Sequence, residues 1–167
     1  ELMYALGRSM AGLDQPDRFI TEACSRVRST LGFGYVAVHI PEDANVGSEV
    51  AGQTHCDGSS INVGDGEHLN RLLAVIARSV KGSEVFSGPQ AIVRPLRNDA
   101  GIVGMITAGD KQREAENISS YDTKLVDAVG GLMSTFLANT RLYGDLRDMV
   151  FGVLEALSAA IDAKDPY

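Results

Sequence analysis

The sequence predicts an α+β domain in which helices pack on one face of an antiparallel sheet, with one long helix at the C-terminal end. Two β-type segments, 91–97 and 102–108, are separated by a four-residue turn and so predict a hairpin. Apolar residues before and between the β-type segments recur at three- and four-residue intervals, as on the buried face of a helix. From Ser119 to Ala163 the helical pattern continues almost without interruption.

Two helices are expected before the first strand. Residues 2–13 carry apolar side chains at helical spacing. Asp14 and Pro16 then stand where an N-cap and a first-turn proline would. A second amphipathic helix follows over 19–31, and Gly32 is suited to end it.

The central part of the chain alternates between strand and loop signals. Residues 35–40 form a β-type run that ends at a proline, and a weaker strand is expected near 49–55. The glycine-rich stretch 57–66 predicts a loop. Helical periodicity returns over 69–80, and glycines and a proline over 82–89 predict a second loop before the hairpin.

The last helix is too long to pack wholly on one small domain. Ser119 and Asp122 resemble a capping box with an aspartate in place of the usual Glu or Gln. A helix from Ser119 to Ala163 would be about 67 Å long. Its far half therefore needs a partner.

The far half of this helix has the apolar pattern of a two-helix seam, which predicts a parallel homodimer. Its members advance by four, three, four and four residues, close to a heptad repeat. They are Leu142, Leu146, Met149, Val153 and Leu157. The alternative is that these residues pack on a domain that follows.

The composition and net charge of the chain argue against several classes of function. The 167 residues are 44% hydrophobic and 22% charged, as in an ordinary globular protein. A net charge of −7 argues against binding to nucleic acid or to an anionic membrane surface. No apolar run reaches the roughly 20 residues of a membrane span. Two distant cysteines predict reduced thiols and a cytoplasmic protein. Because the chain starts at Glu1, we expect a fragment.

Several short stretches, taken in order, resemble one family. They are Ala77-Arg78-Ser79-Val80-Lys81-Gly82-Ser83-Glu84-Val85, the hairpin strands Ala91–Arg97 and Gly101–Ile106, and the closing helix with Ser119–Leu125 and Leu137–Tyr143. Together with the order of elements they resemble the GAF family over residues 1–143. The resemblance implies a GAF-like (PAS-like) fold and a non-catalytic sensor role.

A second resemblance lies at the C-terminal end. Leu157-Ser158-Ala159-Ala160-Ile161-Asp162-Ala163-Lys164-Asp165-Pro166-Tyr167 is similar to the first helix of HD-GYP domains. That family comprises metal-dependent phosphodiesterases that hydrolyse cyclic di-GMP, and its metal-binding histidines and aspartates come after this segment. The expected organisation is a GAF sensor domain (1–143), a connecting helix (144–156) and the start of a truncated HD-GYP domain (157–167).

A ligand pocket is expected between the sheet and the loop-and-helix segment 57–76. Alternation places Tyr35 and His39 on one side of their strand and its aliphatic residues on the other, toward the helices. Arg94 shares a strand face with Ile92 and Leu96, and a paired Arg in an apolar cleft would suit an anionic ligand. The alternative for Arg94 is a pair with an acidic residue or a side chain that extends to solvent.

Other chemistry is weakly supported. Cyclic-nucleotide-binding GAF domains carry a signature of which only Lys111 and Asp122 match here, and a salt bridge between the two is the preferred interpretation. The spacing of histidines and cysteines predicts no metal site. Sulfoxide reduction by a thiol pair is the alternative, but Cys24, on a helix amid core residues, and Cys56, at a loop edge, are not expected to form such a pair.

We therefore expect a regulatory sensor module that dimerises and relays a signal through its last helix to an HD-GYP phosphodiesterase. Catalytic residues, a metal and a cofactor are not predicted in this chain, and a small-molecule effector of unknown identity stays open. The alternatives are a purely structural dimerisation spacer and the sensor domain of another bacterial signalling protein, such as a histidine kinase.

Overall fold

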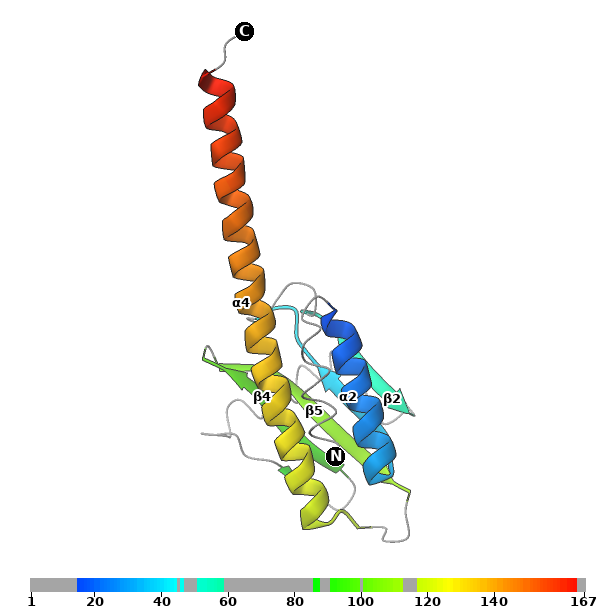
Figure 1. Cartoon of the computed structure of the whole chain (residues 1–167). Helices are drawn as coiled ribbons and strands as arrows, with labels where there is room; N and C mark the ends of the chain where they lie inside the picture. Colours follow the sequence, from blue (N-terminus) through cyan, green and yellow to red (C-terminus); the bar gives the residue numbers. More distant parts are fainter. Residues whose placement is uncertain are drawn as a thin grey trace.

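A computed structural model describes residues 15–44, 46, 51–58, 86–87, 91–99, 101–112 and 117–164. The described elements follow one another as α2, β1, β2, β3, β4, β5 and α4 (Figure 1). The helices expected over 2–13 and 69–80 and most of the loop expected over 57–66 lie outside the described residues.

The strands form one antiparallel sheet with the order β2-β1-β5-β4-β3. Their bounds are β1 Phe33–His39, β2 Thr54–Gly58, β3 Phe86–Ser87, β4 Ala91–Asn98 and β5 Gly101–Lys111. The predicted hairpin is confirmed as β4–β5, in which Asn98 pairs with Gly101. The strand expected near 49–55 forms later in the sequence, as β2, and the short β3 lies in a stretch predicted to be a loop.

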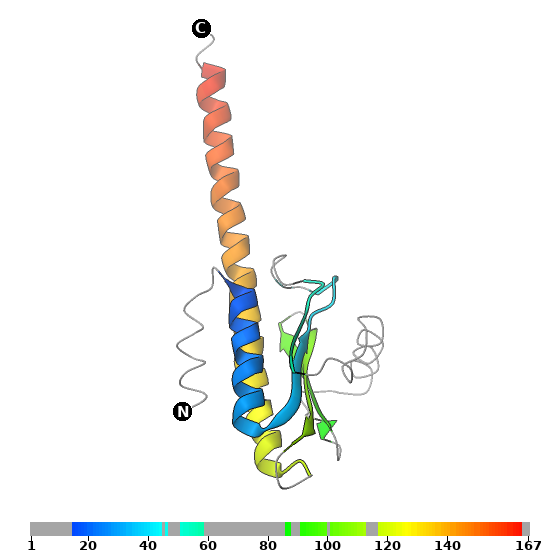
Figure 2. The ribbon, with the colours of Figure 1, turned by 90° about the vertical axis from the view of Figure 1, so that its right-hand side faces the viewer.

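The described helices α2 (Pro16–Leu31) and α4 (Ser120–Lys164) lie side by side on one face of the sheet (Figure 2). Pro16 occupies the first turn of α2, as predicted, but the N-cap is Gln15 and not Asp14. Gly32 ends the helix in the left-handed conformation, with φ of 70°, and its N–H donates to the carbonyl of Arg28 at 2.8 Å.

The main core fills the space between these helices and the sheet. Phe19 of α2 and Phe136 of α4 stack with ring centroids 4.1 Å apart. From the sheet, Val36, Val38 and Ile40 join the same buried cluster. The prediction that the aliphatic side of the first strand faces the helices is therefore confirmed.

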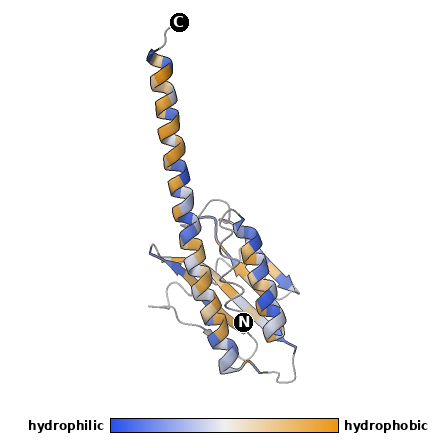
Figure 3. Cartoon of the chain, in the orientation of Figure 1, coloured by the Kyte–Doolittle hydropathy of each residue, from blue (hydrophilic) through white to orange (hydrophobic). Residues whose placement is uncertain are grey.

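Helix α4 confirms the expected long C-terminal helix, with 45 residues. The capping box is also formed: the Ser119 N–H donates to the Asp122 carboxylate at 2.8 Å, and the Asp122 N–H donates to Ser119 Oγ at 3.2 Å. Residues up to Thr140 pack on the domain, whereas the helix beyond projects away from it and is rich in apolar residues (Figure 3).

Candidate functional site

The face of the sheet away from α2 and α4 carries a cluster of buried polar groups, here called the second face. Residues that pair directly across an antiparallel sheet point to the same side. Tyr35, Ala37 and His39 of β1 therefore share this face with their partners on β2 and β5. The partners are Thr54, Cys56 and Gly58 on one side and Met105, Thr107 and Gly109 on the other.

Tyr35 lies across β5 on the second face, where the absence of a side chain at Gly109 makes room for its ring. A Cβ added to Gly109 would lie 2.6 Å from the Tyr35 hydroxyl oxygen, far inside van der Waals contact. Burial raises the pKa of Tyr35, and electrostatic interactions with Asp110 and Cys56 raise it further. The hydroxyl group is therefore protonated at neutral pH and can donate a hydrogen bond.

His39 lies two residues further along the same face. It is buried, and its Nδ1 lies 2.8 Å from Oγ1 of Thr54 on the neighbouring strand. This contact fixes the plane of the ring. Tyr35 and His39 are thus brought to one face of the sheet, as predicted from the alternation.

Arg94 does not join Tyr35 and His39, although the sequence grouped the three in one pocket. It pairs across the sheet with Ile106, a member of the core cluster, and therefore points toward the helices. Its Nε donates to Oδ1 of Asp127 on α4 at 2.7 Å, and its Nη1 donates to the carbonyl of Pro95 at 3.1 Å. The alternative of an acidic partner is the one that the structure shows.

Gly130 of α4 makes room for Arg94. A Cβ at Gly130 would overlap the Cδ of Arg94 and lie 2.7 Å from its Nε, whereas a Cβ at Gly131 would lie 3.6 Å from the nearest guanidinium nitrogen. The Arg94 side chain is only 8% exposed, while that of Asp127 is 49% exposed. Arg94 therefore links β4 to the first half of α4, and its side chain packs against Gly130.

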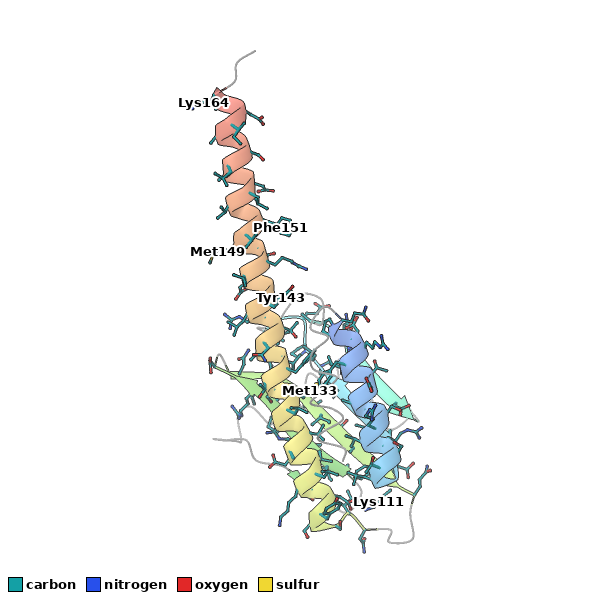
Figure 4. The ribbon with its side chains drawn as sticks, in the orientation of Figure 1. Lys111, Met133, Tyr143, Met149, Phe151 and Lys164 are labelled. Carbon is teal, nitrogen blue, oxygen red and sulfur yellow. The ribbon has the colours of Figure 1, made fainter. Side chains whose placement is uncertain are left out.

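A second ion pair holds the start of α4. Lys111 lies at the end of β5 (Figure 4). It pairs with the buried Asp122, which also accepts hydrogen bonds from the backbone and the hydroxyl of Ser119. Burial alone would raise the pKa of Asp122, but the hydrogen bonds from Lys111 and Ser119 outweigh it and hold this pKa below its ordinary value. The salt bridge preferred from the sequence is confirmed.

Acid should weaken the domain through Asp122. Because the folded-state pKa is lowered, the carboxylate contributes stability above its ordinary pKa, and this contribution is lost as the pH falls through the lower, folded value. We expect the difference in free energy of unfolding between the wild type and Asp122→Asn to shrink between about pH 6 and about pH 3 in urea titrations. A difference between the wild type and Asp122→Asn that does not change with pH would contradict the expectation.

The distal half of α4 carries a run of exposed apolar side chains. Each predicted seam residue is more than half exposed, from Val153 and Leu157 at 55% to Met149 at 68%. Val150, Leu154 and Ile161 are exposed beside them, at 50% to 67%. So many exposed large apolar side chains on one helix are unusual for a surface that faces only water.

No model of a protein family matches the chain, and no curated protein matches its sequence. The fold of the chain, however, is similar to that of several solved structures. The GAF domain of an Acinetobacter phosphoenolpyruvate-protein phosphotransferase has a TM-score of 0.58 at 9% identity, over 86% of this chain and 95% of that one. The Thermosynechococcus elongatus PixJ GAF domain, in its blue-light-absorbing form, has a TM-score of 0.55 at 12% identity, over 86% and 95%. The chain has a GAF-like fold.

A third similar structure is an enzyme. The free methionine-R-sulfoxide reductase from Neisseria meningitidis, in complex with its substrate, has a TM-score of 0.56 at 11% identity, over 86% of this chain and 90% of that one. In the GAF-like domain described here, Cys24 is buried in the helix-side core, whereas Cys56 is exposed on the second face. Both thiols are free, and burial, with smaller effects from Cys56 and Asp57, raises the pKa of Cys24 to about 12. Cys24 is therefore a poor nucleophile.

Further features bear on metals and membranes. Within the described parts of the GAF-like domain, no three His, Cys, Asp or Glu side chains gather in a way that would bind a metal ion. His55 faces the helices, where burial lowers its pKa against the opposing effect of Asp17.

None of the described helices combines the length and the apolar character that crossing a membrane requires. His68 and most of the segment expected to border the pocket, 57–76, lie outside the described residues.

Proposed function

We propose that the chain is a sensor and relay module that forms a parallel homodimer along the distal half of α4. The observation that carries this proposal is the exposed apolar stripe on a helix whose base is packed against the sheet. Because the helix is continuous from Ser120 to Lys164, a movement of its base is transmitted to its far end. The GAF-like domain would supply the input and the stripe would join two copies.

A second copy of the chain suits the stripe. At 100° per residue, the five seam residues and Val150 lie within about 60° of Leu146 around the helix. The charged residues between Leu142 and Ile161 lie about 100° or more from Leu146. They are Asp145, Arg147, Asp148 and Glu155. An apolar stripe flanked by charge is typical of a helix that forms a two-helix coiled coil, in which the stripe packs against its own copy across a twofold axis.

The input is proposed to act on the second face. Tyr35 and His39 place a phenolic hydroxyl group and an imidazole on a face that also carries two threonines among apolar and small side chains, as in many small-molecule pockets. Arg94 lies on the opposite face of the sheet and is assigned a different role: it anchors α4 to β4 through Asp127. An effector that shifted the sheet would thereby bias the base of α4.

The output is proposed to be an HD-GYP phosphodiesterase that acts on cyclic di-GMP in the cytoplasm. The support is the resemblance of 157–167 to the first helix of that family, of which residues 157–164 continue α4 without a break. The chain itself is proposed to be regulatory and non-catalytic. A histidine kinase sensor and a structural spacer are outcomes of the test below.

The test is to assay the full-length protein for hydrolysis of cyclic di-GMP with a divalent metal, and then to insert residues after Tyr143. Two inserted residues turn the distal helix by about 200°, whereas seven turn it by only about 20°. We expect the two-residue insertion to change activity by about 5- to 150-fold, the usual range of allosteric coupling, and the seven-residue insertion to change it little.

Each other result has a defined meaning. Activity that is insensitive to both insertions would indicate a spacer that carries no signal. An absence of hydrolysis in the intact protein would remove the phosphodiesterase assignment, and autophosphorylation with ATP would replace it with a kinase.

A further inference from the structure

The apolar stripe of distal α4 is wider than one two-helix seam needs. A two-stranded coiled coil uses two positions in seven, in alternating steps of three and four residues. Adjacent residues Met149 and Val150 are both apolar and at least half exposed. So are the adjacent residues Leu142 and Tyr143. The stripe therefore holds more apolar positions than one register can bury.

Two complete seven-residue registers can be traced through the stripe. Register A consists of Leu142, Leu146, Met149, Val153, Ala156 and Ala160. Register B consists of Tyr143, Leu146, Val150, Val153, Leu157 and Ala160. Both advance in strict steps of three and four, and both use Leu146, Val153 and Ala160. They differ only at three neighbouring pairs of positions.

We propose that the dimer of α4 helices has two alternative seams, registers A and B, and that the signal consists of an exchange between them. This inference rests on the dimer proposed above. At 100° per residue, the centres of the two registers lie about 50° apart around the helix. A rotation of each helix by that amount exchanges one seam for the other without separating the shared residues.

The two registers are closely balanced, because each is favoured at a different end. In the first two turns, register A buries Leu142 and Met149. Register B instead buries the smaller Val150, together with Tyr143, whose hydroxyl group needs a hydrogen-bond partner when buried. In the later turns, register B buries Leu157, whereas register A buries only Ala156. Neither register therefore buries the larger apolar side chains along the whole length of the helix. Packed interfaces of this kind switch between discrete arrangements. A small bias at the base of α4 is then enough to change their populations.

Neighbouring residues provide an internal control. Phe151 is 58% exposed but lies about 140° from Leu146, outside both registers. Figure 4 shows Met149 and Phe151 pointing to opposite sides of α4. A disulfide between copies at position 151 would therefore report only random collision.

The experiment is disulfide cross-linking of single-cysteine probes in the 167-residue chain. Cys56 is exposed and is replaced by serine, while the buried Cys24 is kept because its raised pKa makes it unreactive. Leu146→Cys and Val153→Cys test the dimer in either register. Met149→Cys reports register A, Val150→Cys reports register B, and Phe151→Cys gives the background rate.

The exchange is tested by a swap that conserves composition, Ala156→Leu with Leu157→Ala. The swap moves one leucine from register B to register A, seven residues away from both probes. We expect it to raise the ratio of cross-linking at position 149 to that at position 150 by at least about fivefold.

The outcomes separate the two proposals. An unchanged ratio, or a change in the opposite direction, would overturn the two-register inference even if the dimer is real. Background rates at both Leu146→Cys and Val153→Cys would show instead that the proposed dimer does not form, and both proposals would fall.

Discussion

Replacing Leu146 and Val153 with aspartate should convert the proposed dimer into a monomer. The two positions lie at the centre of the seam, and the double variant would place four carboxylates against one another across the twofold axis. Opposed like charges cost several kcal/mol, so the dissociation constant should rise at least about a thousandfold. Sedimentation velocity over a range of concentrations measures this directly.

A matched variant controls for added charge. Phe151→Asp with Ser158→Asp introduces the same two charges at the same seven-residue spacing, but on the opposite side of the helix. It should sediment as the wild type does. A Leu146→Asp, Val153→Asp variant that still sediments as a dimer would place the interface elsewhere on the domain.

Gly130→Ala should destabilise the domain, whereas Gly131→Ala should stabilise it. Alanine is favoured over glycine within a helix by about 0.5–1 kcal/mol, and Gly131 has space for the added methyl group. At Gly130 the same group would overlap the side chain of Arg94. Overpacking typically costs about 1–3 kcal/mol, and displacing Arg94 would also strain its ion pair with Asp127.

The two alanine variants differ by one position, so their comparison isolates the contact with Arg94. We expect Gly130→Ala to unfold at a lower urea concentration than Gly131→Ala, with a difference of about 1–3 kcal/mol in the free energy of unfolding. Adding Arg94→Ala should remove most of that difference. Equal stability of the two glycine variants would show that Arg94 does not require a glycine at position 130.

The fold followed from the sequence because its strongest signals are local. The hairpin of β4 and β5, the start of α2 at Pro16 and the end of α4 near Ala163 were each predicted within about three residues, since turn and capping chemistry acts over a few positions. Strand β2 begins later than the strand predicted near 49–55, and strand β3 was not predicted. Both are short strands at the edges of the sheet, and their position depends on pairing with distant residues.

The candidate site was predicted only in part. Alternation correctly placed Tyr35 and His39 on one face, but it says nothing about how that strand aligns with β4. Arg94 was grouped with them, although its own face carries Ile92 and Leu96, which belong to the helix-side core. The Gly130-Gly131 pair within a helix was a usable signal, because glycine in a helix interior often marks a close approach of another group.

The unbroken α4 is also a mechanical lever arm. From Thr140, where packing on the domain ends, to Lys164 the helix extends about 36 Å. A tilt of about 5° at its base would move the far end by about 3 Å, more than half of one helical pitch. The packed segment Ser120–Thr140 is about 30 Å long, so the same tilt about its middle moves the ends of that segment by about 1.3 Å. The domain would thereby convert a shift of about an ångström at its sheet into a displacement more than twice as large at Lys164.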